Sequence, residues 1–209
     1  MDLGRIKPTQ TYFNMGYEEK EIKANVVYKG KILNLRVDDI LTPDGCPAKR
    51  EYVEHRGGAG ILAIDNEGYV YLVRQYRYAY REELLEIPAG KLEVGEAPIV
   101  TATRELEEET GLKGKITEFG LLYPTPGYTN EPLYVFLATD LEKVERHLDE
   151  GEFLDVVCIP FREAYDKVMR GELRDGKTVF AILKYHALKI VVTYNFFFAR
   201  THIHALKYS

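Results

Sequence analysis

The sequence predicts an α/β fold in which helices cover a mixed sheet, with a small antiparallel sheet near the N-terminus. Along the chain the expected order is strands, one helix, more strands and then two helices, which is typical of a sheet packed between helices. Two hairpin turns, Pro43-Asp44-Gly45 and Asn66-Glu67-Gly68, separate strand-like segments. With 209 residues the chain can bury a sizeable core, so we expect one main domain with a small appended sheet.

The first strands are expected before residue 55. Residues 1–22 show little periodicity and are expected to form an arm. Residues 32–37 alternate in part between apolar and polar side chains, and residues 50–54 return as a strand after the first turn. This pair of segments predicts the small antiparallel sheet.

The central part of the chain carries the other elements. A helix is expected to begin at Pro98, whose fixed φ is already helical, and to stop at Gly111, which can adopt the left-handed conformation that ends a helix. The remaining expected elements are strands at residues 61–64, 69–74, 84–89, 116–122, 133–137 and 153–159, and helices at residues 161–170 and 178–189.

Composition indicates an ordinary globular protein, with 45% hydrophobic and 29% charged residues. The net charge of −5 argues against a nucleic-acid backbone as the main partner. No basic and apolar leader opens the chain, and the longest apolar stretch, Ile190 to Ala199, is too short to span a bilayer. We therefore expect a cytoplasmic protein with neither nucleic-acid nor membrane partners.

Three carboxylates share one face of the central helix. Glu105, Glu108 and Glu109 lie at positions i, i+3 and i+4, so they are expected within about 6 Å of one another. Their repulsion is unfavourable unless a cation lies among them, and hard oxygen ligands suit Mg²⁺ or Mn²⁺. The alternative, from E-L-E-E-E alone, is a solvated acidic helix.

The wider run around this helix fits the pattern G-x5-E-x7-R-E-U-x-E-E-x-G-U, where U is a bulky aliphatic residue. Its defined positions are Gly90, Glu96, Arg104, Glu105, Leu106, Glu108, Glu109, Gly111 and Leu112. A chance match is on the order of one in 10⁹ per starting position. Here the chain resembles the Nudix hydrolases, which implies a Nudix-type α/β/α sandwich and metal-dependent cleavage of nucleoside diphosphates linked to another group.

Segments outside the run resemble the ADP-ribose pyrophosphatase branch of that family. They are EHRGGAG at residues 54–60, VRQYR at 73–77, LLEIPAG at 84–90 and PGYTNE at 126–131. This resemblance implies hydrolysis of ADP-ribose, a small nucleotide, to AMP and ribose 5-phosphate. It also implies a homodimer, because the branch's small N-terminal sheet pairs two subunits. We therefore expect a dimerisation sheet in residues 1–55, the Nudix domain in residues 56–190, and a C-terminal tail of unknown role in residues 191–209.

The resemblance also implies site residues. The expected metal ligands are the Ala89 carbonyl and the carboxylates of Glu105, Glu108 and Glu109, and Arg104, one turn before Glu108, would hold that carboxylate in place. The expected substrate contacts are Arg56, Arg77, at the diphosphate, and Glu131, at the distal ribose. A surface charge is the alternative for either substrate arginine.

A general base is still needed, because the helix carboxylates are occupied by metal. In the branch it comes from a loop between the last strands, where this chain has Asp149-Glu150-Gly151-Glu152. Glu150 aligns best and Glu152 next, and the alternative is a solvated loop. The chain has no Trp to stack on a base, so Tyr or Phe would have to do so.

Other functions remain open from the sequence. The same chemistry could act on another nucleotide sugar or a dinucleotide, such as GDP-mannose, NADH or a diadenosine polyphosphate. A non-catalytic module that binds ADP-ribose is a further alternative, although such modules typically lack part of the carboxylate set.

One competing pattern resembles a phosphate-binding P-loop. Residues 171–178, GELRDGKT, match G-x4-G-K-[ST], but that motif needs a preceding strand, and residues 161–170 have helical spacing. We therefore interpret residues 171–178 as a connection between two helices and expect Lys177→Ala to leave catalysis unchanged.

Overall fold

The computed structural model describes residues 16–148 and 151–205. They form two compact units, one of residues up to His55 together with Gly127–Asn130, and one of Arg56–Pro126 together with residues from Glu131 onwards. The mixed α/β architecture predicted from the sequence is confirmed.

The first unit is a four-stranded antiparallel sheet built around β3. Its strands are β1 (Lys20–Lys23), β2 (Val26–Lys29), β3 (Leu33–Leu41) and β4 (Pro47–His55). β3 pairs with each of the other three strands. The predicted hairpin is confirmed, but β1 and β2 were not predicted from the sequence. Both are four residues long and exposed throughout, so they lack the buried face that produces a recognisable alternation.

The loop Gly127–Asn130 belongs to the first unit. The Val53 backbone N–H donates to the Tyr128 carbonyl at 2.8 Å, and the His55 N–H donates to the Asn130 side-chain oxygen at 2.9 Å. Residues about 75 positions apart are therefore joined by hydrogen bonds, and β4 gains a partner beyond its own hairpin.

The second unit contains a seven-stranded mixed sheet. Its strands are β5 (Gly58–Ile64), β6 (Tyr69–Arg77), β7 (Glu82–Glu86), β8 (Ala89–Lys91), β9 (Leu112–Leu122), β10 (Leu133–Lys143) and β11 (Leu154–Pro160). The order is β11-β6-β5-β10-β9, with β7 beside β6 and β8 beside β5; β5 and β10 run parallel. The strand expected at 84–89 is divided between β7 and β8, and Pro88, which has no N–H to donate, lies at the break.

The helices are α1 (Pro98–Thr110), α2 (Phe161–Met169) and α3 (Gly176–Ala205). α1 has the predicted ends, since Pro98 opens it and Gly111, at φ 67°, closes it by donating its N–H to the Glu107 carbonyl. α3 continues to Ala205, beyond the predicted end at residue 189 and into the expected tail. None of the helices in the described part of the chain has both the length and the apolar character needed to cross a bilayer.

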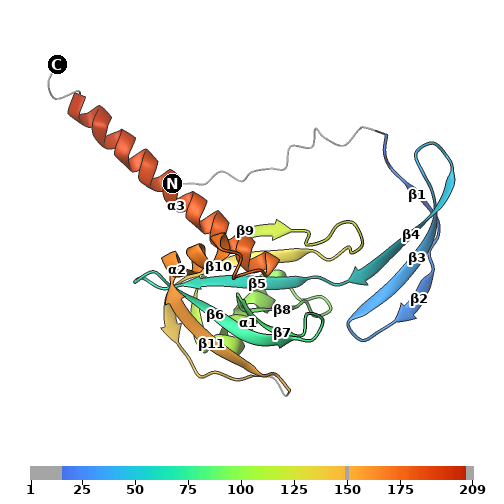
Figure 1. Ribbon diagram of the computed structural model, residues 1–209, viewed down its shortest axis with the longest axis horizontal. Coiled ribbons are helices and arrows are strands. Elements are labelled where there is room, and N and C mark those ends of the chain that lie inside the picture. Colours follow the sequence, from blue (N-terminus) through green and yellow to red (C-terminus); the bar gives the residue numbers. More distant parts are fainter. Residues whose placement is uncertain (1–15, 149–150, 206–209) are drawn as a thin grey trace. The chain divides into compact units, whose positions relative to one another are not determined.

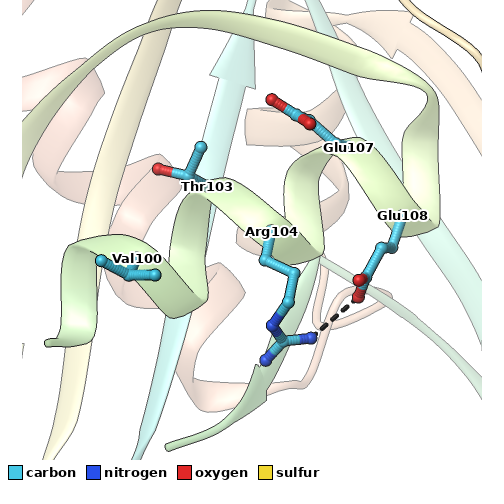
Figure 2. A pocket seen from close by; sticks show the side chains of 5 residues that line it. All are labelled: Val100, Thr103, Arg104, Glu107 and Glu108. Carbon is cyan, nitrogen blue, oxygen red and sulfur yellow. Dashed lines mark hydrogen bonds and ion pairs between the residues drawn. The ribbon is translucent and has the colours of Figure 1, made fainter. Parts of the chain in front are cut away.

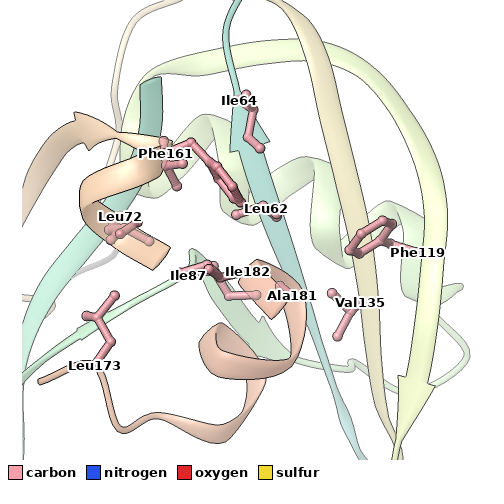
Figure 3. Packing of buried hydrophobic residues seen from close by; sticks show 12 residues of the cluster. Leu62, Ile64, Leu72, Ile87, Phe119, Val135, Phe161, Leu173, Ala181 and Ile182 are labelled. Carbon is pink, nitrogen blue, oxygen red and sulfur yellow. The ribbon is translucent and has the colours of Figure 1, made fainter. Parts of the chain in front are cut away.

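The second unit is a sandwich, with α1 on one side of the sheet and α2 and α3 on the other (Figure 1). Alternate residues of β5 pack toward these two sides. On the α1 side, the apolar cluster contains Ala59, Ile61 and Ala63 together with the fully buried Leu106 of α1. Leu62 and Ile64 lie in the cluster on the side of α2 and α3. Figure 3 shows that cluster, which includes Leu72, Ile87, Phe119, Val135, Phe161, Leu173, Ala181 and Ile182. The sheet therefore holds α1 and the start of α3 in fixed positions on its two faces.

Candidate metal-dependent hydrolase site

The α1 helix buries two of its carboxylates. Ala102 and Leu106 are fully buried in the core, and Glu105 and Glu109 flank them with only 7% and 3% of their surface exposed. Packing of the apolar residues thus carries the two acidic side chains out of water, which is costly for a charge without a partner.

Glu109 lies against the end of the β7–β8 segment. Its Oε2 accepts a hydrogen bond from the Ala89 N–H at 3.0 Å. Burial raises the pKa of Glu109 to about 8, the negative charge of Glu105 adds to this, and the Ala89 N–H acts in the opposite direction. Without a cation, much of the Glu109 population is therefore protonated near neutral pH.

Glu105 lies directly over Gly90. A Cβ atom placed on Gly90 would be 1.7 Å from Glu105 Oε1, so only glycine fits there without displacing the carboxylate. Burial raises the pKa of Glu105, while the nearby Arg104 opposes that rise. The position of the Glu105 carboxylate therefore requires glycine at residue 90.

Arg104 holds the carboxylates from the outer side of α1. Its Nη1 is 2.9 Å from Glu105 Oε1 and 2.8 Å from Glu108 Oε2, and its Nε is 3.6 Å from Glu96 Oε1. Figure 2 shows the arginine reaching along the helix to Glu108. These two residues line a surface hollow of about 350 Å³ together with Val100, Thr103 and Glu107.

The three acidic residues of the helix are therefore not equivalent. Glu105 and Glu109 point into the protein, whereas Glu108 pairs with Arg104 at the surface. Among the side chains that the structure describes, those of residues 16–148 and 151–191, no three acidic, His or Cys groups gather closely enough to hold a metal ion as they stand. Two buried, mutually repelling carboxylates beside a backbone segment nevertheless fit a hard divalent cation, which would offset both burial and repulsion.

The loop before β11 contributes a further carboxylate. Glu152 is exposed, and its negative charge adds to the raised pKa of both Glu105 and Glu109, so it lies within electrostatic reach of them. Glu150, the first choice from the sequence, lies outside the described residues.

Arg77 is part of a buried ion-pair group. Its Nε and Nη2 each donate to the Glu86 carboxylate at 2.7 Å, and Glu86 has 1% of its surface exposed. Burial opposes ionisation of Glu86, but Arg77 and Lys177 outweigh it and hold the pKa of Glu86 below its usual value. The hydrogen bonds to Glu86 raise the pKa of Arg77, and the negative charge of Glu109 makes a smaller contribution. The ion-pair group of Arg77 is therefore electrostatically coupled to the buried carboxylates of α1.

Two other expected substrate contacts lie elsewhere on the second unit. Arg56 precedes β5, is largely exposed, and lies 3.8 Å from Glu93. Glu131 is half-buried and lies just before β10.

Sequence reasoning missed the contribution of Glu86 and the buried contacts of Lys177. Lys177 is buried and pairs with Glu86 and Asp175, so residues 171–178 do more than connect two helices. The signal for Glu86 was available, because a lone charge in the apolar run LLEIP requires a partner when buried. The partner itself, 91 positions away, was not predictable.

Two family models match this chain. One, described as the NUDIX domain, matches residues 54–181. The other, described as the nucleoside diphosphate sugar hydrolase N-terminal domain, matches residues 19–53.

Similar curated proteins align over most of both chains. An ADP-ribose pyrophosphatase of Bacillus subtilis (strain 168) is 43% identical over 168 residues, which are 79% of this chain and 91% of the relative. A methanol dehydrogenase activator of Bacillus methanolicus is 41% identical, with coverage of 79% and 91%. An ADP-ribose pyrophosphatase of Mycobacterium tuberculosis is 37% identical, with coverage of 82% and 85%.

The raised pKa of Glu109 predicts a pH dependence of stability in the metal-free protein. A carboxyl whose folded pKa is about 8 stabilises the fold fully below its unfolded pKa of 4.5, and this contribution is lost as the pH rises towards 8. We expect a loss on the order of a few kcal/mol between pH 5 and pH 8 that Glu109→Gln removes. Urea unfolding in the presence of chelator measures it.

The matched control for this measurement is Glu107→Gln, on another face of the same helix, which should keep the wild-type pH dependence. Equal slopes for wild type and Glu109→Gln would contradict the buried, proton-binding state of Glu109.

Proposed function

This chain belongs to the Nudix hydrolase family, and on that premise we propose that it hydrolyses the diphosphate bond of ADP-ribose to give AMP and ribose 5-phosphate. The observation that carries the proposal is the alignment with two ADP-ribose pyrophosphatases over 79% and 82% of this chain. The match of residues 19–53 to an N-terminal domain of nucleoside diphosphate sugar hydrolases supports the same substrate class.

Nudix hydrolases generally need a divalent metal, and we propose Mg²⁺, with Mn²⁺ as the alternative. The carbonyl of Ala89 and the carboxylates of Glu105 and Glu109, assisted by Glu108, would hold it. When bound, the metal would neutralise charge developing on the phosphates and help deprotonate the attacking water. Burial of Glu105 and Glu109 supports this assignment, because a cation would relieve their repulsion.

The remaining residues act on the substrate and on the ligands. Arg104 orients Glu105 and Glu108 through its guanidinium. Two of the five N–H donors of Arg77 bind Glu86, which leaves three for the diphosphate oxygens. In our proposal Arg56 also contacts substrate and Glu131 binds the distal ribose.

In the hydrolytic step, a water oxygen attacks one phosphorus of the diphosphate. A P–O bond to that phosphorus forms, the bond from it to the bridging oxygen breaks, and the bridging oxygen leaves on the other phosphate. The proton of the water passes to a carboxylate of the Asp149–Glu152 loop, either Glu150 or Glu152. The electrostatic reach of Glu152 to both buried carboxylates supports Glu152 as that base.

The substrate proposal predicts a ranking of activities. We expect kcat/KM for ADP-ribose to exceed those for GDP-mannose, NADH and diadenosine tetraphosphate by at least about tenfold, and chelation to abolish turnover. Glu109→Gln should lower kcat by a factor of about 10² or more, because a ligand charge acts in the transition state. Initial rates across Mg²⁺ and Mn²⁺ concentrations measure both effects.

Glu107→Gln is the control, and it should retain wild-type rates. Faster cleavage of one of the other substrates would replace ADP-ribose in the proposal, whereas tight binding of ADP-ribose without cleavage would favour a binding module. Wild-type turnover by Glu109→Gln would overturn the ligand assignment.

The base proposal predicts a separation of kcat from KM. Glu152→Gln should lower kcat by about 10²-fold with little change in KM, and should remove the acidic limb of the pH–rate profile. Glu150→Gln, measured in parallel, should have a smaller effect, and the exposed Glu145→Gln should have none. A larger effect for Glu150→Gln would assign the base to Glu150, and full activity in both variants would exclude this loop.

We further propose a homodimer formed through the first unit. Its only buried side chains among the described residues are Asp38 and Ile40, so the sheet has too small a core to be stable on its own. Apolar side chains are exposed on it instead: Ile22, Val26, Val27, Tyr28, Ile32, Leu33 and Leu35. A second copy would cover such a surface.

The dimer proposal predicts that charge on this surface separates the subunits. The double variant Val26→Asp and Tyr28→Asp should be a monomer by light scattering at concentrations where the wild type is a dimer, because burying two carboxylates in an apolar interface is unfavourable. Lys31→Asp, in the next turn, should remain a dimer. A double variant that stays dimeric would exclude this surface as the interface.

A further inference from the structure

The first turn of α3 contacts the segment that leads into the site. Lys177 and Thr178 lie in that turn, with 8% and none of their surface exposed. They belong to the P-loop-like GELRDGKT, yet the element before that stretch is the helix α2. Lys177 and Thr178 instead contact charged and polar groups of the protein itself, which include Glu86 and Asp175.

Lys177 completes the ion-pair group of Arg77. Glu86 Oε1 accepts from Arg77 Nε, and Glu86 Oε2 accepts from both Arg77 Nη2 and Lys177 Nζ. Lys177 Nζ also lies 3.0 Å from Asp175 Oδ1. Two cations and two carboxylates thus balance in a largely buried group. Without Lys177, Glu86 would depend on Arg77 alone for compensation, and the guanidinium would be drawn further toward it.

Thr178 fixes the next residue of the same segment. Its hydroxyl donates to Asp175 Oδ2 at 2.6 Å, and because a hydroxyl has one proton, it can only accept from the Ile87 N–H, 2.8 Å away. Asp175 also accepts from the Thr178 N–H at 3.0 Å, as a capping residue at the start of α3 does.

The four residues from Glu86 to Ala89 are consequently anchored one after another. After Glu86 and Ile87, the Pro88 carbonyl accepts from the Ile61 N–H at 2.9 Å, and the Ala89 N–H donates to Glu109. The start of α3 and the end of α1 therefore hold opposite ends of one short segment, although they lie on different faces of the sheet.

We propose that the start of α3 is a positioning element for the substrate site, in which Lys177 orients Arg77 through Glu86 and Thr178 fixes the segment up to Ala89. This inference rests on the proposed function, since it concerns binding of the diphosphate by Arg77. Neither residue touches the reacting atoms.

The primary test is Lys177→Met, which removes the charge and keeps the length of the side chain. We expect a 10- to 100-fold increase in KM and in the dissociation constant of a non-hydrolysable methylene analogue of ADP-ribose, with a smaller change in kcat, as is typical when a supporting partner is lost. Lys177→Arg should recover most of the affinity because it restores the positive charge. Calorimetry gives the dissociation constants independently of turnover.

A double variant separates positioning from general destabilisation. If Lys177 acts through Arg77, Lys177→Met should change the affinity by less than about threefold in a protein that already carries Arg77→Ala. The guanidinium that Lys177 orients is then already absent. Independent action would multiply the two losses. Lys184→Met is the control, since Lys184 lies two turns further along α3 and donates to the Phe119 carbonyl; it should keep wild-type affinity.

Thr178→Val provides a second route if Lys177→Met does not fold. It keeps the side-chain shape, leaves the Ile87 N–H without its acceptor, and should lower kcat/KM by about tenfold or more. Wild-type KM and affinity in either folded variant would overturn the inference. A wild-type enzyme that prefers another substrate would refute the ADP-ribose proposal instead, and the variants would then be compared on that substrate.

Discussion

Burial of two carboxylates beside a glycine is the constraint on which the site depends. Glu105 and Glu109 are drawn out of water because α1 packs its apolar side against β5 and β10. Gly90 leaves space for one carboxylate, and the Ala89 N–H binds the other. The arrangement is electrostatically unfavourable by itself, and this explains both the raised pKa of Glu109 and the suitability of the site for a divalent cation.

A second buried charge group lies on the same backbone segment, around Glu86. Buried ion pairs seldom stabilise a fold more than apolar residues of similar size would, so their presence calls for another explanation. Here Glu86 is bound by Arg77 and by Lys177, and the backbone that follows it leads to Ala89 and Gly90. The group therefore links the start of α3 to the residues that we propose to bind substrate and metal, and the positioning role that we propose would account for the cost of burying it.

Local signals predicted much of this structure. Pro98 and Gly111 bound α1 as expected, because proline suits a first helical turn and glycine suits a left-handed end. The i, i+4 spacing likewise predicted the pairing of Arg104 with Glu108. β1 and β2 escaped prediction because they are short and exposed, and α3 proved longer than its predicted range of residues 178–189.

The sequence by itself determined the family, the mixed α/β fold and the carboxylate helix, since these follow from spacing along one element. It could not decide which carboxylates are buried, because that depends on how α1 packs on the sheet. It also suggested that Lys177 only joins two helices. Only the tertiary structure brings Lys177 to Glu86, 91 positions away, since a contact between distant elements leaves no periodic signal in either of them.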